Sequence, residues 1–250
     1  MSLWVYTFCW NEEKILPFFL RHYKHLLNAE RIIVYDNESD DNSLSEIGRW
    51  KNLGVEARTY KTGGMHSESG AMVQIRNECW HEARGRADWV AVVDCDELLF
   101  HHDFSGFLRR CEAHGTTLVR AYGFEMVAAE FPRDDGRTQL SLLVRKGVQS
   151  PLYSKPCLFR PDHIRTISYA HGAHDCKAPG NVRYMPSGSL KMLHYKRLGW
   201  DYFWNRVERL RNRSDPRDLK QGYSEHYRYP QESHLLEFQR MMTYAVDVTT

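Results

Sequence analysis

The chain has 250 residues, of which 42% are hydrophobic and 13% are aromatic. This length and composition are typical of one large globular domain and exclude an intrinsically disordered chain. The 34 lysines and arginines nearly balance the 32 aspartates and glutamates. This balance argues against a nucleic-acid-binding protein, because such proteins carry a large basic surface.

Cysteine usage and hydropathy indicate a cytoplasmic protein. None of the six cysteines forms a CxxC pair, so we expect free thiols in a reducing compartment and no thiolate zinc site. The apolar run at residues 1–8 is too short for a signal peptide and has no basic segment before it. No stretch reaches the length of a membrane span, so we expect at most peripheral contact with the inner membrane.

Short apolar runs alternate with helical patterns in the first half of the chain. Residues 3–8, 31–35 and 55–60 are predicted strands, because they are short and rich in β-forming residues. Residues 89–93 form a continuous apolar run, which is typical of a strand buried on both faces. Strands that alternate with helices through short connections predict a mostly parallel sheet in an α/β fold.

Three helical patterns lie between these strands. Asn11 is the predicted N-cap of the first helix, and Pro17 falls near its start, where proline is tolerated. Apolar residues repeat at helical spacing at Ile15, Phe19, Tyr23 and Leu26. A second helix is predicted around residues 43–51. After a glycine-rich loop at residues 61–70, one face of a third helix carries Met72, Ile75, Cys79 and Ala83.

The regular alternation weakens after residue 97. Residues 117–195 contain short β-like runs, prolines and polar turns, which predict mixed strands and loops. From Trp200 onward, Phe203, Val207 and Leu210 mark a final amphipathic helix with arginines around it. The chain contains no internal repeat and no low-complexity linker, so we expect one domain over residues 1–250.

Three acidic residues follow the predicted buried strand 89–93 within four positions. In extended backbone, Asp94 and Asp96 project to the same side while Cys95 points away. Ligands of open parallel sheets bind beyond the carboxyl ends of the strands, and two carboxylates there require a positive charge between them. A hard divalent cation meets this requirement. The alternative is a polar strand end whose carboxylates are solvated or cap the next segment.

Three segments resemble the opening signatures of family-2-like glycosyltransferases, which have the GT-A fold, and in particular the bacterial polysaccharide type. In chain order they are residues 5–23, 33–43 and 89–97. The signatures are a strand leading into an Asn-Glu helix start, a strand ending in Asp before an Asp/Ser-rich turn, and a DxD strand. The resemblance implies a three-layer α/β/α sandwich with a mostly parallel central sheet. It also implies a nucleotide-sugar-binding half at residues 1–100 and an acceptor-binding half with a C-terminal helix at residues 101–250.

This resemblance implies a metal-dependent and inverting glycosyltransferase. A sugar would pass from a nucleotide-sugar donor to a glycan or lipid-linked glycan acceptor in surface polysaccharide synthesis. Asp94, Asp96 and His194 would hold Mn²⁺ or Mg²⁺, which would neutralise the leaving diphosphate. One imidazole among oxygen ligands suits these cations better than structural zinc. For His194 the alternative is a core histidine.

The resemblance also places the contacts to the donor. The residues expected to contact the base, ribose or phosphates are Thr7, Asn11, Asp36, Arg76, Asn77, Asp94 and Lys196. Asp36 could instead open an Asx-turn, and Arg76 could lie on a polar helix surface. Neither GxGxxG nor GxxxxGK[ST] occurs, so the diphosphate must be neutralised by metal and side chains and not by a glycine-rich loop.

The predicted transfer needs a group that accepts the proton of the acceptor hydroxyl. The sequence leaves four candidates open, of which the first is favoured: Glu125, Glu97, His174 and Asp175. Two other classes of function also remain at this point. A nucleotidyltransferase of similar fold would normally have a glycine-rich basic loop after the first strand, which residues 9–14 do not provide. A glycan-binding module without catalytic activity would need no metal-binding acids.

Overall fold

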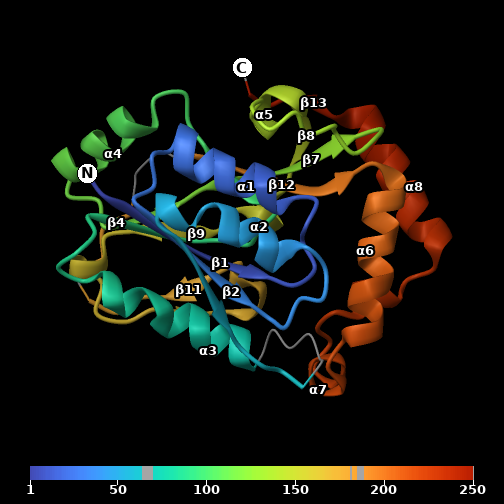
Figure 1. Ribbon diagram of the computed structural model, residues 1–250, viewed down its shortest axis with the longest axis horizontal. Helices are drawn as coiled ribbons and strands as arrows, with labels where there is room; N and C mark the ends of the chain where they lie inside the picture. Colours follow the sequence, from blue (N-terminus) through green and yellow to red (C-terminus); the bar gives the residue numbers. More distant parts are fainter. Residues whose placement is uncertain (64–69, 181, 185–188, 250) are drawn as a thin grey trace.

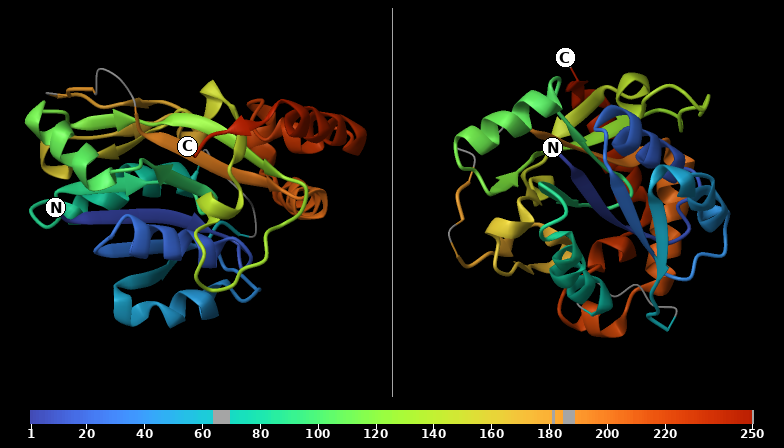
Figure 2. Two further views of the ribbon diagram at one scale, coloured as in Figure 1. Left: turned by 90° about the horizontal axis from the view of Figure 1, so that it is seen from above. Right: turned by 60° about the vertical axis from the view of Figure 1, so that its left-hand side comes forward.

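The computed structural model describes residues 1–63, 70–180, 182–184 and 189–249, and Figure 1 shows its course. Its principal sheets have six and five strands, and a short two-stranded ribbon accompanies them. Figure 2 shows the two sheets as layers of one molecule. Residues 64–69 of the predicted loop 61–70 lie outside the described residues.

The six-stranded sheet is mostly parallel, as predicted. Its first four strands in spatial order are parallel, and the fifth is antiparallel to both of its neighbours. The order is β3 (Val55–Thr59), β2 (Arg31–Asp36), β1 (Leu3–Cys9), β4 (Trp89–Val92), β9 (Pro156–Phe159) and β6 (Leu118–Arg120). The four predicted strands of the first half are therefore confirmed, with bounds that differ by one residue at most.

Helices cover both faces of this sheet, which confirms the α/β/α layering. In β1, Leu3 and Val5 pack into one hydrophobic cluster, whereas Trp4 and Tyr6 pack into another on the opposite face. The first cluster also holds apolar residues of α1 (Leu16–Arg21), α2 (Ser43–Arg49) and α4 (Phe104–Ala113). The second holds those of α3 (Ala71–Glu78) and the 3-10 helix that follows it. Burial on both faces explains why these strands read as continuous apolar runs.

The first helix begins later than predicted. Asn11 has a positive φ of 53° and is not the N-cap, a position that Ile15 occupies. The Asn11 side chain instead bonds with Asp40 across the loop. After α1 the chain continues as a π-helix over His22–Leu26, which buries Tyr23 and leaves Leu26 exposed. The wider turn breaks the α-helical spacing that placed Leu26 on one face with Tyr23.

The five-stranded sheet begins where the chain leaves β4. Its order is β13 (Val246–Asp247), β8 (Lys146–Gln149), β7 (Tyr122–Ala128), β12 (Lys191–Leu198) and β5 (Glu97–Phe100). The chain passes from one sheet to the other through a turn at residues 95–96. Residues 95–96 therefore form a turn and are not extended, so the argument from extended backbone does not hold, although Asp94 and Asp96 both line the same cleft.

The predicted amphipathic helix at Trp200 is confirmed, but it is not the final one. It is α6 (Trp200–Arg213), and α7 (Pro216–Lys220) and α8 (Gln231–Tyr244) follow it. Phe203 of α6 packs against Phe238 of α8, and Figure 1 shows these helices together beside the ends of the sheets. In α8 Leu235, Phe238 and Met242 stand at helical spacing, so the sequence did carry a signal for this helix, which the prediction missed.

The remaining elements are short. They are α5 (Leu140–Leu143), β10 (Ser168–Tyr169), β11 (Cys176–Lys177) and several single 3-10 turns. Within the described ranges, none of the helices combines the length and apolarity needed to cross a bilayer.

Candidate active site

A cleft opens where the parallel strands of the first sheet end. Trp10, Asn37, Tyr60 and Asp94 each come within two residues after one of its four parallel strands, and all four line the cleft. The second sheet, α3, α6 and the 3-10 turn after α7 supply the other walls. The loops that follow β1 and β4 and those around residues 153–155 and 174 also contribute. The charged and aromatic lining residues, apart from those named above, are Glu12, Arg76, Asp96, Glu97, Tyr153, Lys155, His174, His194, Lys196, Arg206, His226 and Tyr227, together with Phe8.

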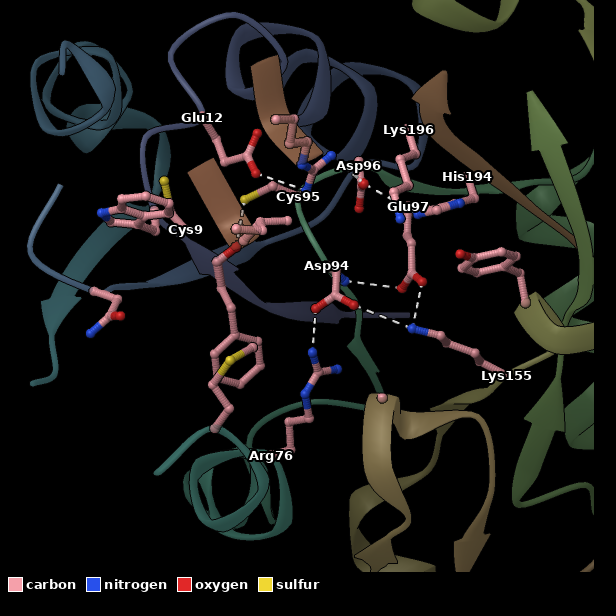
Figure 3. Close-up of a pocket in the computed structure, with 18 of the residues that line it drawn as sticks. Cys9, Glu12, Arg76, Asp94, Cys95, Asp96, Glu97, Lys155, His194 and Lys196 are labelled. Carbon is pink, nitrogen blue, oxygen red and sulfur yellow. Dashed lines mark hydrogen bonds and ion pairs between the residues drawn. The ribbon is translucent and has the colours of Figure 1, made fainter. Parts of the chain in front are cut away.

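The turn after β4 directs its two aspartates to different partners, as Figure 3 shows. Asp94 accepts a hydrogen bond from Arg76 through Oδ1, and its Oδ2 lies 3.2 Å from the Nζ of Lys155. The Oδ2 of Asp96 lies 3.2 Å from the Nε2 of His194 and 2.5 Å from a guanidinium nitrogen of Arg206. Each aspartate is thus already paired with at least one arginine or lysine.

Asp96 is held in its ionised form. Its side chain is buried, and burial alone would raise its pKa. The charges of Arg206 and His194 outweigh burial and hold the pKa of Asp96 well below its ordinary value. Asp96 therefore presents a full negative charge in the cleft at neutral pH.

Lys155 is a buried cation between two carboxylates. Its Nζ lies 2.6 Å from Glu97 Oε1 and 3.2 Å from Asp94 Oδ2. Burial by itself would lower the pKa of Lys155, but the attraction of Glu97 and Asp94 outweighs it and raises that pKa. Glu97 Oε2 in turn accepts the backbone N–H of Asp94 at 3.0 Å. This arrangement fixes the conformation of the turn.

Glu12 is a further buried carboxylate in the cleft. Its Oε1 lies 2.8 Å from Arg206, whereas Oε2 is buried without a hydrogen-bond partner among the described residues. Burial raises the pKa of Glu12 to about 7, although Arg206 acts in the opposite direction. An unpaired buried acceptor of this kind is costly unless a ligand or water donates to it.

The aromatic ring of Tyr153 covers His194. The two rings are stacked with centroids 3.9 Å apart. The short helix that carries Tyr153, Pro151–Tyr153, lies directly against Gly123 of β7. A Cβ atom at Gly123 would lie 2.3 Å from the carbonyl carbon of Tyr153 and 2.6 Å from the backbone oxygen of Ser150. Only glycine allows this approach of backbone to backbone.

We therefore expect Gly123→Ala to displace the segment that carries both Tyr153 and Lys155. The overlap should lower the free energy of unfolding by about 1–3 kcal/mol, measured by urea denaturation. The matched control is Gly48→Ala in α2, where nothing lies within 4 Å of the added Cβ. That change should leave stability unchanged or raise it by about 1 kcal/mol. Equal stability of the Gly123→Ala variant and the wild type would contradict the close approach.

The three predicted metal ligands, Asp94, Asp96 and His194, do not lie together as one group. In the part of the chain that the structure describes, no group of three or more His, Cys, Asp or Glu side chains could together hold a metal ion. Asp94 lies apart from the other two, with Arg76 and Lys155. Asp96 and His194 do lie together and offer one carboxylate and one imidazole. This pair fits a hard cation that takes its remaining ligands from substrate phosphates and water.

Glu125 does not lie in the lining of the cleft, where a general base would have to reach the acceptor. It is buried behind His194 and is absent from the lining of the cleft. Its Oε1 lies 3.4 Å from His194 Nδ1, and its Oε2 pairs with Arg197. Glu125 is thus not brought to the lining of the cleft, and its role as the base stays a prediction that this position does not favour.

The other three candidate bases differ in position. His174 lines the cleft. Glu97 also lines it, but both of its oxygens are engaged by Lys155 and by the backbone of Asp94. Asp175 lies outside the cleft, with 71% of its side chain exposed, and pairs with Arg120. Its catalytic role stays a prediction that this exposed position does not favour.

Four of the predicted donor contacts lie outside the cleft. Thr7 is fully buried and donates a hydrogen bond to Cys95 Sγ at 3.4 Å. Asp36 accepts the N–H of Ser39 at 3.1 Å, which is the alternative Asx-turn. Asn77 accepts the N–H of Tyr169 at 2.8 Å. Asn11 lines a separate small cavity. All four hold the scaffold of the site, whereas the predicted contacts Arg76, Asp94 and Lys196 do line the cleft.

Several residues of the cleft were missed from the sequence, and some left a signal. Trp10 and Asn37 come directly after predicted parallel strands, the position at which such sheets bind ligands. Arg206 lies between the apolar residues Phe203 and Val207 of the predicted helix, so it shares their buried side. Lys155 left no signal: it comes just before a short apolar strand, and a surface lysine can stand at the same position.

Comparisons with solved structures find distant similarity to glycosyltransferases. TarS 1–349 from S. aureus has a TM-score of 0.45 and 12% identity over 84% of this chain and 64% of that one. Its complex with UDP-GlcNAc has a TM-score of 0.43 and 12% identity over 91% and 71%. Glucosyl-3-phosphoglycerate synthase from Mycobacterium tuberculosis, with Mn²⁺ and UDP-glucose, has a TM-score of 0.33 and 18% identity over 49% and 43%.

Similarity at this level does not identify a substrate for this chain. No protein of curated function matches the sequence. The profile of one family does match, and it covers residues 5–250, almost the whole chain. This match confirms the prediction of a glycosyltransferase: the chain belongs to glycosyltransferase family 92.

Proposed function

We propose that this glycosyltransferase binds a nucleotide-sugar donor in the cleft and transfers its sugar to a glycan or lipid-linked glycan acceptor. In this proposal residues 1–100 bind the donor and residues 101–250 the acceptor, within one domain. Trp10, Asn37 and Tyr60 lie where the nucleoside would bind, after the strands β1, β2 and β3. Lys196 and Arg76 line the cleft within reach of a diphosphate.

The balance of charge in the cleft is the observation that carries this proposal. Four carboxylates and four lysine or arginine side chains line it. The carboxylates are Glu12, Asp94, Asp96 and Glu97, and the cations are Arg76, Lys155, Lys196 and Arg206. The cleft is thus nearly neutral when its histidines are neutral. A nucleotide sugar brings two negative charges on its diphosphate, which would be costly to bury without compensation.

One bound divalent cation restores this balance, so Mn²⁺ or Mg²⁺ is part of the proposal. Asp96 and His194 would hold it, and the cation would supply positive charge to the leaving diphosphate. Asp96 needs no deprotonation for this task, because the charge of Arg206 already acts to keep its pKa low. Asp94 would act through its pairs with Arg76 and Lys155, which fix the turn that presents Asp96.

The acceptor hydroxyl needs a base, and His174 is the proposed one. It lines the cleft, whereas Glu125 and Asp175 do not, and Glu97 is engaged on both oxygens. Attack by a hydroxyl that His174 deprotonates would invert the configuration at the sugar carbon in a single displacement. A role in surface polysaccharide synthesis by a cytoplasmic enzyme remains a proposal that derives from the sequence resemblance.

Nucleotide binding with and without metal tests this function. Calorimetric titration with UDP, GDP and CMP in Mn²⁺ should show binding of at least one nucleoside diphosphate. Replacing Mn²⁺ with EDTA should weaken that binding at least about tenfold, or about 1.4 kcal/mol. The same affinity in EDTA would exclude the metal, and no binding of any nucleotide in either buffer would exclude a nucleotide-sugar donor.

A further inference from the structure

Arg120, the last residue of β6, joins two loops of the cleft wall. One terminal nitrogen of its guanidinium donates to the carbonyl of Ser154 at 2.7 Å and to the carbonyl of His174 at 3.0 Å. The other terminal nitrogen pairs with the carboxylate of Asp175. Each loop also supplies a ring to the cleft, Tyr153 and His174, and these rings meet edge to face with centroids 5.8 Å apart. A single guanidinium thus connects the backbones that carry two residues of the site.

The pairing of β6 brings Arg120 to these loops. Val119 pairs with Leu158 of β9, whereas Arg120 pairs with Pro156. One step along β6 therefore matches two steps along β9. Arg120 lies opposite the first residue of β9, which follows Ser154 by two positions. From there its side chain reaches the carbonyl of Ser154.

The loop that carries His174 contains strained backbone. Gly172 and Ala173 have φ of 61° and 56°, and this left-handed region is unfavourable for alanine because of its Cβ atom. Strained backbone persists only where the surrounding structure holds it. The pairing of β10 with β11 closes the base of the loop. The bond from Arg120 to the carbonyl of His174 holds the residue next to the strained pair.

The bonds to the two carbonyls, and not the ion pair with Asp175, provide this tie. The side chains of Arg120 and Asp175 are 40% and 71% exposed, so solvent screens their attraction and the pair contributes little. Hydrogen bonds from a charged donor are stronger than those between neutral groups. A guanidinium also keeps its charge at every pH at which the protein is folded, so the tie is permanent.

We infer that Arg120 is a positioning residue for sugar transfer: by bonding the backbone of both loops, it holds His174 and Tyr153 in a fixed relation across the cleft. The inference rests on the proposed function in one respect, because it takes His174 as the base. A base must lie within hydrogen-bond reach of the hydroxyl, and a displacement of about 1 Å can slow a reaction about 100-fold. Arg120 lies outside the lining of the cleft, so it acts through His174.

Hydrogen–deuterium exchange of the ligand-free protein tests the tie itself. Arg120→Met should fold normally, because the arginine side chain is 40% exposed. Exchange should become about tenfold faster or more in both loops, the effect of losing a hydrogen bond to a charged group. The reporting amides are Ala173, which donates to the carbonyl of Ala170 at 2.9 Å, and Ser154, which donates to that of Pro151 at 3.0 Å.

The matched control is Arg84→Met. Arg84 is an exposed arginine outside the lining of the cleft, and one of its terminal nitrogens donates to the carbonyls of Ile164 and Arg165 at 2.8 and 2.7 Å. This variant should speed exchange around residues 164–165 and leave both cleft loops unchanged. Unchanged exchange of the two cleft loops in Arg120→Met would overturn the inference.

Reaction rates distinguish positioning from a general loss of structure. The assay is hydrolysis, with water as the acceptor, of the best donor among UDP-, GDP- and CMP-sugars in Mn²⁺. Arg120→Met should lower kcat about 10–100-fold and leave KM for the donor within about threefold, whereas Arg84→Met should keep the wild-type values. Combining Arg120→Met with His174→Gln should be no slower than His174→Gln alone, because both changes disable the same group. Losses that multiply in the double variant would overturn the inference.

The outcomes also separate this inference from the proposed function. If the wild type binds no nucleotide, the proposed function fails, whereas exchange in Arg120→Met needs no ligand and still decides whether Arg120 ties the loops. If the wild type hydrolyses a donor and His174→Gln does so at the same rate, the proposed base and the inference fail together, and the nucleotide-sugar donor stands.

Discussion

Replacing Lys155 with methionine is expected to lower the free energy of unfolding by about 3–5 kcal/mol, the usual cost of removing one partner from a buried ion pair. Lys155 is almost fully buried, and its ammonium lies 2.6 Å from Glu97 and 3.2 Å from Asp94. Methionine keeps much of the volume but leaves Glu97 without its counter-charge, whereas Asp94 keeps its pair with Arg76. Glu97 is fully buried, so water cannot take the place of the ammonium.

Urea denaturation of three variants measures this effect. Lys61→Met removes a lysine from an exposed pair with Glu38, at 3.4 Å, and should change stability by less than about 1 kcal/mol. The double variant Lys155→Met with Glu97→Gln should recover part of the loss, about 0.5–3 kcal/mol, because it removes the uncompensated charge. If Lys155→Met were as stable as Lys61→Met, Lys155 would not be needed to neutralise the carboxylates of the turn after β4.

The elements of the first half could be predicted because their burial leaves a local pattern. A strand packed on both faces, such as β4, is apolar throughout, and a polar turn ends each of these strands. The second sheet leaves a weaker pattern. Its strands pair across long distances in sequence, as β7 does with β12, and no local signal specifies such partners. The shift of register in β12 between His194 and Arg197 belongs to that pairing and could not be predicted either.

The same distinction holds for the site. Asp96 and His194 were predicted from motif and resemblance, and both line the cleft, side by side. The direction of their side chains was not predictable, because the turn at Asp96 depends on a remote contact. The N–H of Tyr195 in β12 donates to the carbonyl of Asp96 at 2.7 Å. The position of Glu125 behind His194 was not predictable for a related reason, since its face of β7 depends on its pairing with β12.

The substitution Asp96→Asn is expected to reduce sugar transfer by about 10²–10³-fold or more, the range seen when one group that stabilises transition-state charge is removed. Asparagine is neutral, so it could not hold a cation beside His194, and the charge of the leaving diphosphate would be under-compensated. Stability should fall less than in Lys155→Met, because Arg206 keeps its partner Glu12 at 2.8 Å. Initial rates with a nucleotide-sugar donor in Mn²⁺ measure the loss.

The pH dependence of stability separates this charge from a purely steric role of Asp96. The pKa of Asp96 is well below its ordinary value of 3.8 in the folded protein. Its contribution is therefore complete above that ordinary value and is lost as the pH falls through the lower folded-state pKa. The wild type should exceed Asp96→Asn in free energy of unfolding by a constant amount at neutral pH and by less in strong acid.

The control for the rate of transfer is Asp175→Asn, which lies outside the cleft and should keep the wild-type rate within about twofold. Wild-type transfer by Asp96→Asn would disprove the assignment of Asp96 to the reaction.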